Sequence, residues 1–240
     1  MNTESDHIVS SFDEELIKLE HLMAEMGGLA EANLEKSIHA LVQRNTELAE
    51  EVVRTDKQID ELETAIDTQA LRIFALRQPM ADDLRAVIGS LKAAHDIERI
   101  GDYAKNVAKR VEVLSQVPMV GSTSRTIARM GDVTRIMMKQ VIDAFIERDA
   151  EKALDVRRRD EEVDQLHTSM FRELLTYMME DPRLITPCTH LLFITKNIER
   201  IGDHATNIAE YVYFIVNGEM PDADRPKSDN TAQTIVEPTE

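Results

Sequence analysis

The sequence predicts an all-α protein built as two tandem three-helix bundles related by pseudo-two-fold symmetry. Three features support this prediction: the composition, the spacing of the apolar residues and an internal repeat. Of the 240 residues, 42% are hydrophobic and only 4% are aromatic, with no Trp. Abundant Ala, Leu, Glu and Arg with few aromatic residues favour helices over strands. The apolar fraction is large enough to bury a sizeable core.

Apolar residues recur at three- and four-residue spacings, as on one face of a helix. Leu16, Leu19, Met23 and Met26 show this spacing in the first long segment. No alternating pattern typical of a strand is evident. The spacing predicts six helices, at residues 8–45, 48–77, 81–116, 122–147, 150–179 and 183–217.

Proline separates several of these segments. Pro79, Pro118 and Pro182 interrupt stretches that otherwise have helical periodicity. Proline in a helix interior removes a hydrogen bond and clashes with the preceding turn, so these positions predict helix boundaries. Residues 219–240 are polar, acidic and proline-bearing, which predicts a disordered tail.

The two halves of the chain repeat each other. A segment that starts with MGGLAEANLEK at Met26 aligns without a gap with one that starts with MGDVTRIMMKQ at Met130, an offset of 104 residues. IERIGDYAKNVA at 97–108 is repeated as IERIGDHATNIA at 198–209, an offset of 101. The difference falls in a connection, where length varies most easily. The repeat predicts one bundle over residues 1–117 and a second over 118–218, packed side by side.

Charge and cysteine content restrict the function. The formal net charge of -17 disfavours binding to nucleic acid or to an anionic membrane surface and favours cations and basic protein surfaces. Cys188 is the single cysteine, so no internal disulfide can form. The sequence shows no signal peptide and no apolar stretch of transmembrane length. These features predict a soluble, cytoplasmic protein.

The repeated motif places acidic residues four positions apart on each half. On a helix such positions lie one above the other, so they form a stripe of carboxylates. The candidates are Asp56, Asp60, Glu98 and Asp102 in the first half, and Asp160, Asp164, Glu199 and Asp203 in the second. Gly101 and Gly202 lie within the same motif, where glycine allows a helix or a ligand to approach closely.

Two interpretations of these carboxylates stay open from the residues alone. They could form a solvated face paired with Arg and Lys. They could also converge from two helices on metal ions, since oxygen ligands suit Mg, Mn, Ca or ferric iron. Recurrence of all four acids in both halves favours metal binding. The histidines are not repeated, because His95 corresponds to Lys196 and His204 to Tyr103, so a histidine ligand is at best optional.

The sequence contains no recognisable catalytic constellation. We find neither a glycine-rich phosphate loop nor a nucleophile elbow, so no catalytic residue is predicted. Two functions remain open for a protein with such acidic faces. One is a metal-dependent phosphoryl hydrolase, in which a carboxylate-bound cluster activates water. The other is a helical scaffold or metal-storage protein.

The paired motifs resemble those of the PhoU family of bacterial phosphate-signalling proteins. MGGLAE, DKQIDELE, RQPMADDLRAV, LLTYMMEDPR and the two IERIGD motifs carry the resemblance, which extends to about Gly218. It implies two three-helix bundles, and metal ions on the eight acidic residues, with Mg, Mn, Fe or Zn as candidates. It also implies a non-enzymatic protein that forms homodimers.

The resemblance further implies a regulatory function. Members of the family act with the Pst phosphate ABC transporter, through its ATPase subunit, and with a phosphate sensor histidine kinase. The expected role is negative regulation of the phosphate regulon and restraint of phosphate uptake. Contact with the membrane is expected only through these partners, and no contact with nucleic acid is expected.

Overall fold

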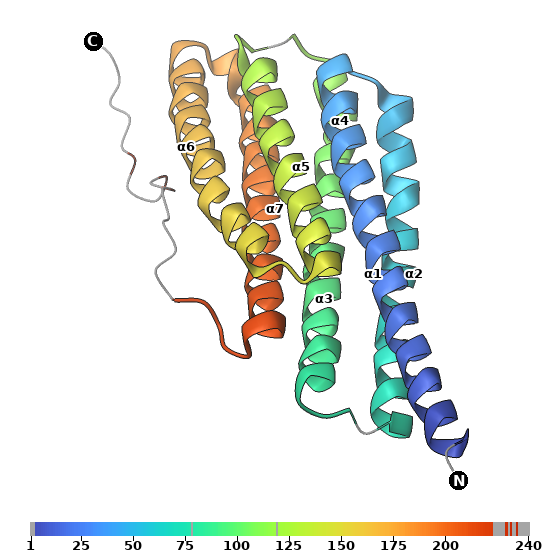
Figure 1. Ribbon diagram of the computed structural model, residues 1–240. Helices are drawn as coiled ribbons and strands as arrows, with labels where there is room; N and C mark the ends of the chain where they lie inside the picture. The colour runs from blue at the N-terminus through green and yellow to red at the C-terminus, as the bar shows by residue number, and fades with distance from the viewer. Residues whose placement is uncertain are drawn as a thin grey trace.

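The computed structural model describes residues 3–77, 79–118 and 120–222, together with residues 229, 231 and 234. Side chains are described from residue 14 onward, except at residue 77. All regular structure in these residues is helical, which confirms the predicted fold class (Figure 1). The elements are α1 (Thr3–Gln43), α2 (Thr46–Arg77), α3 (Ala81–Lys109), α4 (Val111–Ser115), α5 (Thr123–Glu147), α6 (Ala150–Glu180), the 3₁₀ turn η1 (Pro182–Leu184) and α7 (Ile185–Asn217).

The predicted helix bounds differ most clearly from the structure at three places. The first helix begins at Thr3 rather than at residue 8. The predicted helix 81–116 is divided into α3 and α4 at Arg110, whose amide donates to the carbonyl of Val107 in a tightened turn. The predicted helix 183–217 begins with η1, because the Asp181 side chain accepts the Arg183 amide and caps this turn.

Each half begins with a helical hairpin of the same construction. Arg44 and Arg148 occupy equivalent positions after the first helix and both adopt left-handed backbone conformations, with φ of 56° and 53°. The next residues, Asn45 and Asp149, each accept the backbone N–H three residues further on at 3.0 Å. Such side-chain caps satisfy an amide that the first turn of a helix leaves unpaired.

The two bundles pack through equivalent helices. α1 packs against α5 and α3 packs against α7, while α2 and α6 flank this central group on opposite sides (Figure 1). Contact between corresponding helices is the arrangement expected of pseudo-two-fold symmetry. A single apolar core runs through both halves. Between α3 and α7, buried Asp96 accepts hydrogen bonds from His204 and Asn207.

Arg44 also connects the first hairpin to the segment between the bundles. Its guanidinium donates to the carbonyls of Leu114 at 2.8 Å and Ser115 at 2.7 Å, and to that of Val117. These carbonyls lie at the end of α4 and just beyond it. All three contacts come from one terminal nitrogen, so its two hydrogens are shared among carbonyls that a helix end leaves unpaired.

The last helix ends at a glycine. Gly218 has φ 79° and its amide donates to Phe214, which is a common C-terminal cap.

The predicted disordered tail at 219–240 falls largely outside the described residues. Of the part that is described, Asp222 accepts a hydrogen bond from Arg157 at 3.1 Å through its carbonyl. Within the described part of the chain, no helix is long and apolar enough to cross a membrane.

Candidate metal-binding site

The predicted carboxylates of the first half gather between α2 and α3. We call Asp56, Asp60, Glu98 and Asp102 the first acidic face. A methyl group at Gly101 would lie 2.9 Å from Ile59 and 3.3 Å from a carboxylate oxygen of Asp56. Glycine at this position therefore lets α2 approach α3 closely, as the sequence predicted.

One lysine neutralises part of this face. The Lys105 ammonium contacts the carboxylates of Asp56 and Asp102, the latter at 2.5 Å. Burial opposes the charge on this ammonium, but the hydrogen bonds to Asp102 and Asp56 outweigh it and raise the pKa of Lys105. Burial raises the pKa of Asp56, and the contact with Lys105 partly offsets that rise. Asp56 is almost fully buried, whereas Asp60 is exposed.

The other end of the first acidic face contains Glu98, which Lys105 does not contact among the hydrogen bonds and ion pairs described. Burial, together with repulsion from Asp102 and Glu63, raises the pKa of Glu98 to about 7. Arg99 gives limited compensation, since its closest contact to Glu98 is 3.8 Å. Glu98 is therefore a half-buried carboxylate in a strongly negative environment. A cation placed here would gain more than at an exposed carboxylate.

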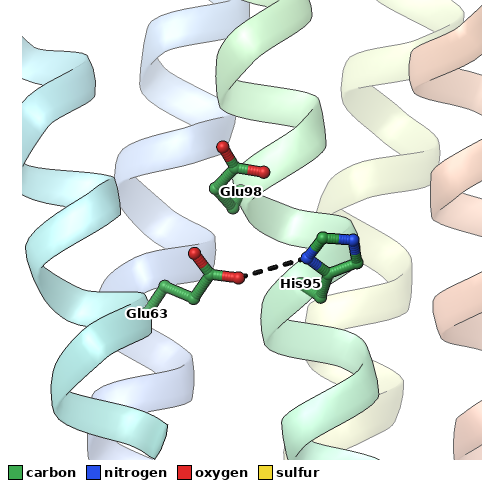
Figure 2. Close-up of side chains that lie close together, drawn as sticks. All are labelled: Glu63, His95 and Glu98. Atoms are coloured by element: carbon green, nitrogen blue, oxygen red, sulfur yellow. Dashed lines mark hydrogen bonds and ion pairs between the residues drawn. The ribbon is translucent and has the colours of Figure 1, made fainter.

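Glu98 is one of three side chains with the spacing of a metal site. Glu63 on α2 and His95 on α3 join it, and one ligand atom from each lies within 4.8 Å of the other two (Figure 2). His95 Nδ1 lies 3.2 Å from Glu63 Oε1. Ligands about 2.1 Å from a tetrahedral ion lie about 3.4 Å apart, so modest side-chain rotation would bring the set together.

Sequence reasoning missed Glu63 and discounted His95. Glu63 follows Asp56 by seven residues, two helical turns, and so lies on the same side of α2. His95 precedes Glu98 by three residues and lies on the same side of α3. Spacing thus contained the signal, but His95 was set aside because it is not repeated in the second half.

The second half carries the corresponding acids between α6 and α7. We call Asp160, Asp164, Glu199 and Asp203 the second acidic face. Asp160, Asp164 and Glu199 are buried, and Asp203 is half-buried. Asp160, Asp164 and Asp203 each take part in further interactions. A methyl group at Gly202 would lie 2.7 Å from Asp160 Oδ1, so glycine again permits close approach of the two helices.

Lysine lies at the opposite end of this second face. Lys196, the counterpart of His95, donates to Glu199 Oε1 at 2.7 Å and lies 3.2 Å from Asp229 Oδ2. Burial raises the pKa of Glu199 to about 7, although the Lys196 hydrogen bond opposes this change. His167, the counterpart of Glu63, is buried, and desolvation and nearby Lys196 lower its pKa to about 4. Among the described residues, its Nδ1 has no hydrogen-bond partner.

The two ends of the first acidic face differ in how well they could bind a cation. At the Glu98 end of the first face, Glu98 together with Glu63 and His95 forms a donor set that suits a divalent ion. At the other end, an ion would have to displace the ammonium of Lys105 from Asp56 and Asp102. Glycine, the neighbouring carboxylates and the half-buried setting create a concentrated negative region in each half.

Comparison with known families identifies the fold. The model of the PhoU domain matches twice, at residues 23–111 and 127–212. The chain belongs to the PhoU family. A PhoU homologue from Rhizobium meliloti, named as a phosphate-specific transport system accessory protein, is 50% identical over 94% of this chain and 95% of its own length. The homologue of the same name from Caulobacter vibrioides is 46% identical over 95% of this chain and 100% of its own length.

Solved PhoU structures have the same architecture. The crystal structure of PhoU from Pseudomonas aeruginosa superimposes with a TM-score of 0.84 at 39% identity, covering 87% of this chain and 100% of the other. That of the phosphate transport system regulatory protein PhoU from Streptococcus pneumoniae gives 0.81 at 30% identity, over 88% and 99%. These matches confirm both the resemblance seen in the IERIGD motifs and the doubled helical fold.

Proposed function

We propose that this chain regulates phosphate transport as an accessory protein of a phosphate-specific transport system. The observation that supports this most strongly is the match of the PhoU domain to both halves. Relatives that are 46% and 50% identical along nearly the whole chain bear the name of such an accessory protein. The doubled helical bundle is also the architecture of the solved PhoU structures.

In its finer form, the proposal is that the chain is an adaptor. It binds the ATPase subunit of the Pst transporter and a phosphate sensor histidine kinase, and keeps the phosphate regulon off when phosphate is plentiful. The net charge of -17 supports association with basic protein surfaces. An adaptor changes its partners' states only by binding those states with different affinity. In this proposal it is non-catalytic, cytoplasmic and homodimeric, and reaches the membrane through its partners alone.

Gene deletion tests this regulatory role. Cells that lack the chain should express an alkaline-phosphatase-type reporter constitutively in high phosphate, and a plasmid copy should restore repression. The matched control is a strain that carries the empty plasmid. A reporter that stays repressed after deletion would contradict negative regulation. Adaptor function further requires that purified protein bind the ATPase subunit and the kinase, which a pull-down with each partner measures.

We also propose that the acidic faces bind metal ions. The converging carboxylates of Asp56, Asp60, Glu98 and Asp102, with their counterparts in the second half, support divalent or ferric ions such as Mg, Mn, Fe or Zn. Mass spectrometry of the metal content, after chelation and refilling, tests this. The double variant Asp102→Asn with Asp203→Asn should lose metal while keeping its helicity. Equal metal in both proteins would show that these motif carboxylates are not ligands.

A further inference from the structure

Because the sequence repeats, residues at equivalent positions of the two halves can be compared directly. Glu63, His95 and Glu98 in the first half correspond to His167, Lys196 and Glu199 in the second. In the second half the central position is occupied by an ammonium, since Lys196 Nζ lies 2.7 Å from Glu199 Oε1. The glutamate of the IERIGD motif therefore contacts a cation at this level of the bundle, and the chain itself supplies it.

The first half has an imidazole where the second has that ammonium. His95 contacts Glu63 and lies beside Glu98 (Figure 2). The nearest described cationic contact to Glu98 is Arg99 at 3.8 Å, which is long for a hydrogen-bonded pair. The His95 side chain is 61% exposed, so an ion can reach it from solvent. Two carboxylates from two helices and one accessible ring nitrogen thus face a common point.

We propose that Glu63, His95 and Glu98 bind one divalent transition-metal ion in the first half alone, and that the Lys196 ammonium takes its place in the second half. This inference rests on the proposed metal binding and deepens it. It names two ligands outside the acid pairs and narrows the proposed metal binding from both acidic faces to the first. It also predicts that the first acidic face binds metal more tightly than the second, although the same four acids recur in both.

The ligand types select the class of ion. Imidazole suits Zn, Fe, Co, Ni and Cu, whereas Mg and Ca prefer oxygen ligands. One ring nitrogen with two carboxylates therefore favours Zn²⁺ over Mg²⁺, and Mn²⁺, which suits carboxylate ligands, should bind more weakly than Zn²⁺ by the usual order of affinity. Water or the neighbouring carboxylate of Asp102 can complete the coordination. Lys105 already neutralises the far end of this face, so the ion adds charge where the lysine does not reach.

The second half is arranged to retain its own ammonium. Lys196 bridges two carboxylates, donating to Glu199 Oε1 at 2.7 Å and to Asp229 Oδ2 at 3.2 Å. Asp229 is itself held in place by Thr231, whose amide and hydroxyl donate to Asp229 Oδ1 at 2.9 Å and 2.6 Å. Arg157 on α6 donates to the carbonyl of Asp222, which precedes Asp229 in the same segment after α7. A metal ion would have to displace an ammonium held by two carboxylates.

Substitutions that exchange the two halves provide the test. Chelator-treated full-length protein is titrated calorimetrically with Zn²⁺, Mn²⁺ and Mg²⁺ separately. His95→Lys copies the second half and should weaken Zn²⁺ binding by at least about tenfold, a change that loss of an outer-shell partner can already produce at metal sites. His39→Lys is the matched control, because this exposed histidine on α1 lies outside the site. Control and wild type should bind alike.

The reverse exchange should create a site. His167→Glu with Lys196→His copies the first half and should add one equivalent of bound Zn²⁺. Circular dichroism checks its folding, and the single variant Lys196→His, which also removes the ammonium, provides the same test if the double variant unfolds. Unchanged stoichiometry in a folded variant would overturn the role assigned to Lys196.

Failure of this inference is distinguishable from failure of the proposed metal binding. If Asp102→Asn loses Zn²⁺ while His95→Lys binds it normally, the acid pairs are the ligands and the present site is wrong. If wild-type protein binds none of the three ions, the present site is wrong, and metal content after refilling with iron decides whether the acid pairs bind metal. Neither result bears on repression of the phosphate reporter, which tests the regulatory function independently.

Discussion

The two halves share a backbone plan but differ in how each neutralises its acidic face. Both hairpins use a left-handed arginine followed by a capping side chain, and both use glycine to bring acidic helices together. The lysines do not follow the repeat. Lys105 contacts the aspartate end of the first face, whereas Lys196 contacts the glutamate end of the second. Local signals thus preserve a fold while single side chains change the cation that each face accepts.

The largest difference between equivalent residues is expected at the two left-handed arginines. Arg44→Ala removes hydrogen bonds to three carbonyls and should lower the free energy of unfolding by about 2–3 kcal/mol. Arg148→Ala removes an exposed ion pair with Glu20 and should cost less than about 1 kcal/mol. Urea unfolding of both variants measures the difference. Because both keep a Cβ at a positive φ, backbone strain cancels, and equal losses would contradict the connecting role of Arg44.

A smaller effect, visible in its pH dependence, is expected from His167. Its pKa in the folded state is about 4, below the ordinary 6.5, so unfolding takes up a proton between these values. Stability from this group is therefore present above pH 6.5 and is lost as the pH falls toward 4. Relative to His167→Gln, the wild type should lose about 2 kcal/mol between about pH 7 and pH 5.

Comparing the two proteins at each pH isolates His167. Glu199, whose raised pKa acts in the opposite direction, is present in both and cancels to first order. Urea unfolding at several pH values gives the difference. Parallel stability curves for wild type and His167→Gln would show that His167 is not held neutral by burial and Lys196.

The smallest expected loss of stability concerns the helix caps, a feature that the two halves share. Asn45→Ala and Asp149→Ala each remove the side-chain acceptor for an amide in the first turn of the following helix. Each should cost about 1 kcal/mol, because both caps have the same geometry. Thermal or urea unfolding measures them, and Asn45→Ser serves as a cap-preserving control. A loss at one hairpin without the other would break the equivalence of the two repeats.

Most of the fold could be predicted from the sequence because the signals are local. Apolar spacing, proline and the repeat locate the long helices to within a few residues. The break at Arg110 could not be predicted, since arginine is a good helix former and the division comes from a tightened turn. The helix start at Thr3 was missed because residues 3–7 lack apolar periodicity.

The candidate site was only partly predictable. The carboxylates were identified because they repeat, and Gly101 and Gly202 indicated the close approach of the helices. Glu63 resembles any solvated glutamate until the register of α2 against α3 places it beside His95. The positions of the Lys105 and Lys196 ammonium groups depend on side-chain rotamers across helices. The spacing of residues along one helix predicts neither the register between helices nor the position of these ammonium groups.

The most direct test of the difference between the halves is anomalous diffraction from crystals of the zinc-loaded protein, with data collected on both sides of the zinc absorption edge. We predict a zinc peak between Glu63, His95 and Glu98, and no peak beside Glu199, where Lys196 provides the charge. Equal peaks on both acidic faces, or a first-half peak that His95 does not contact, would contradict the account.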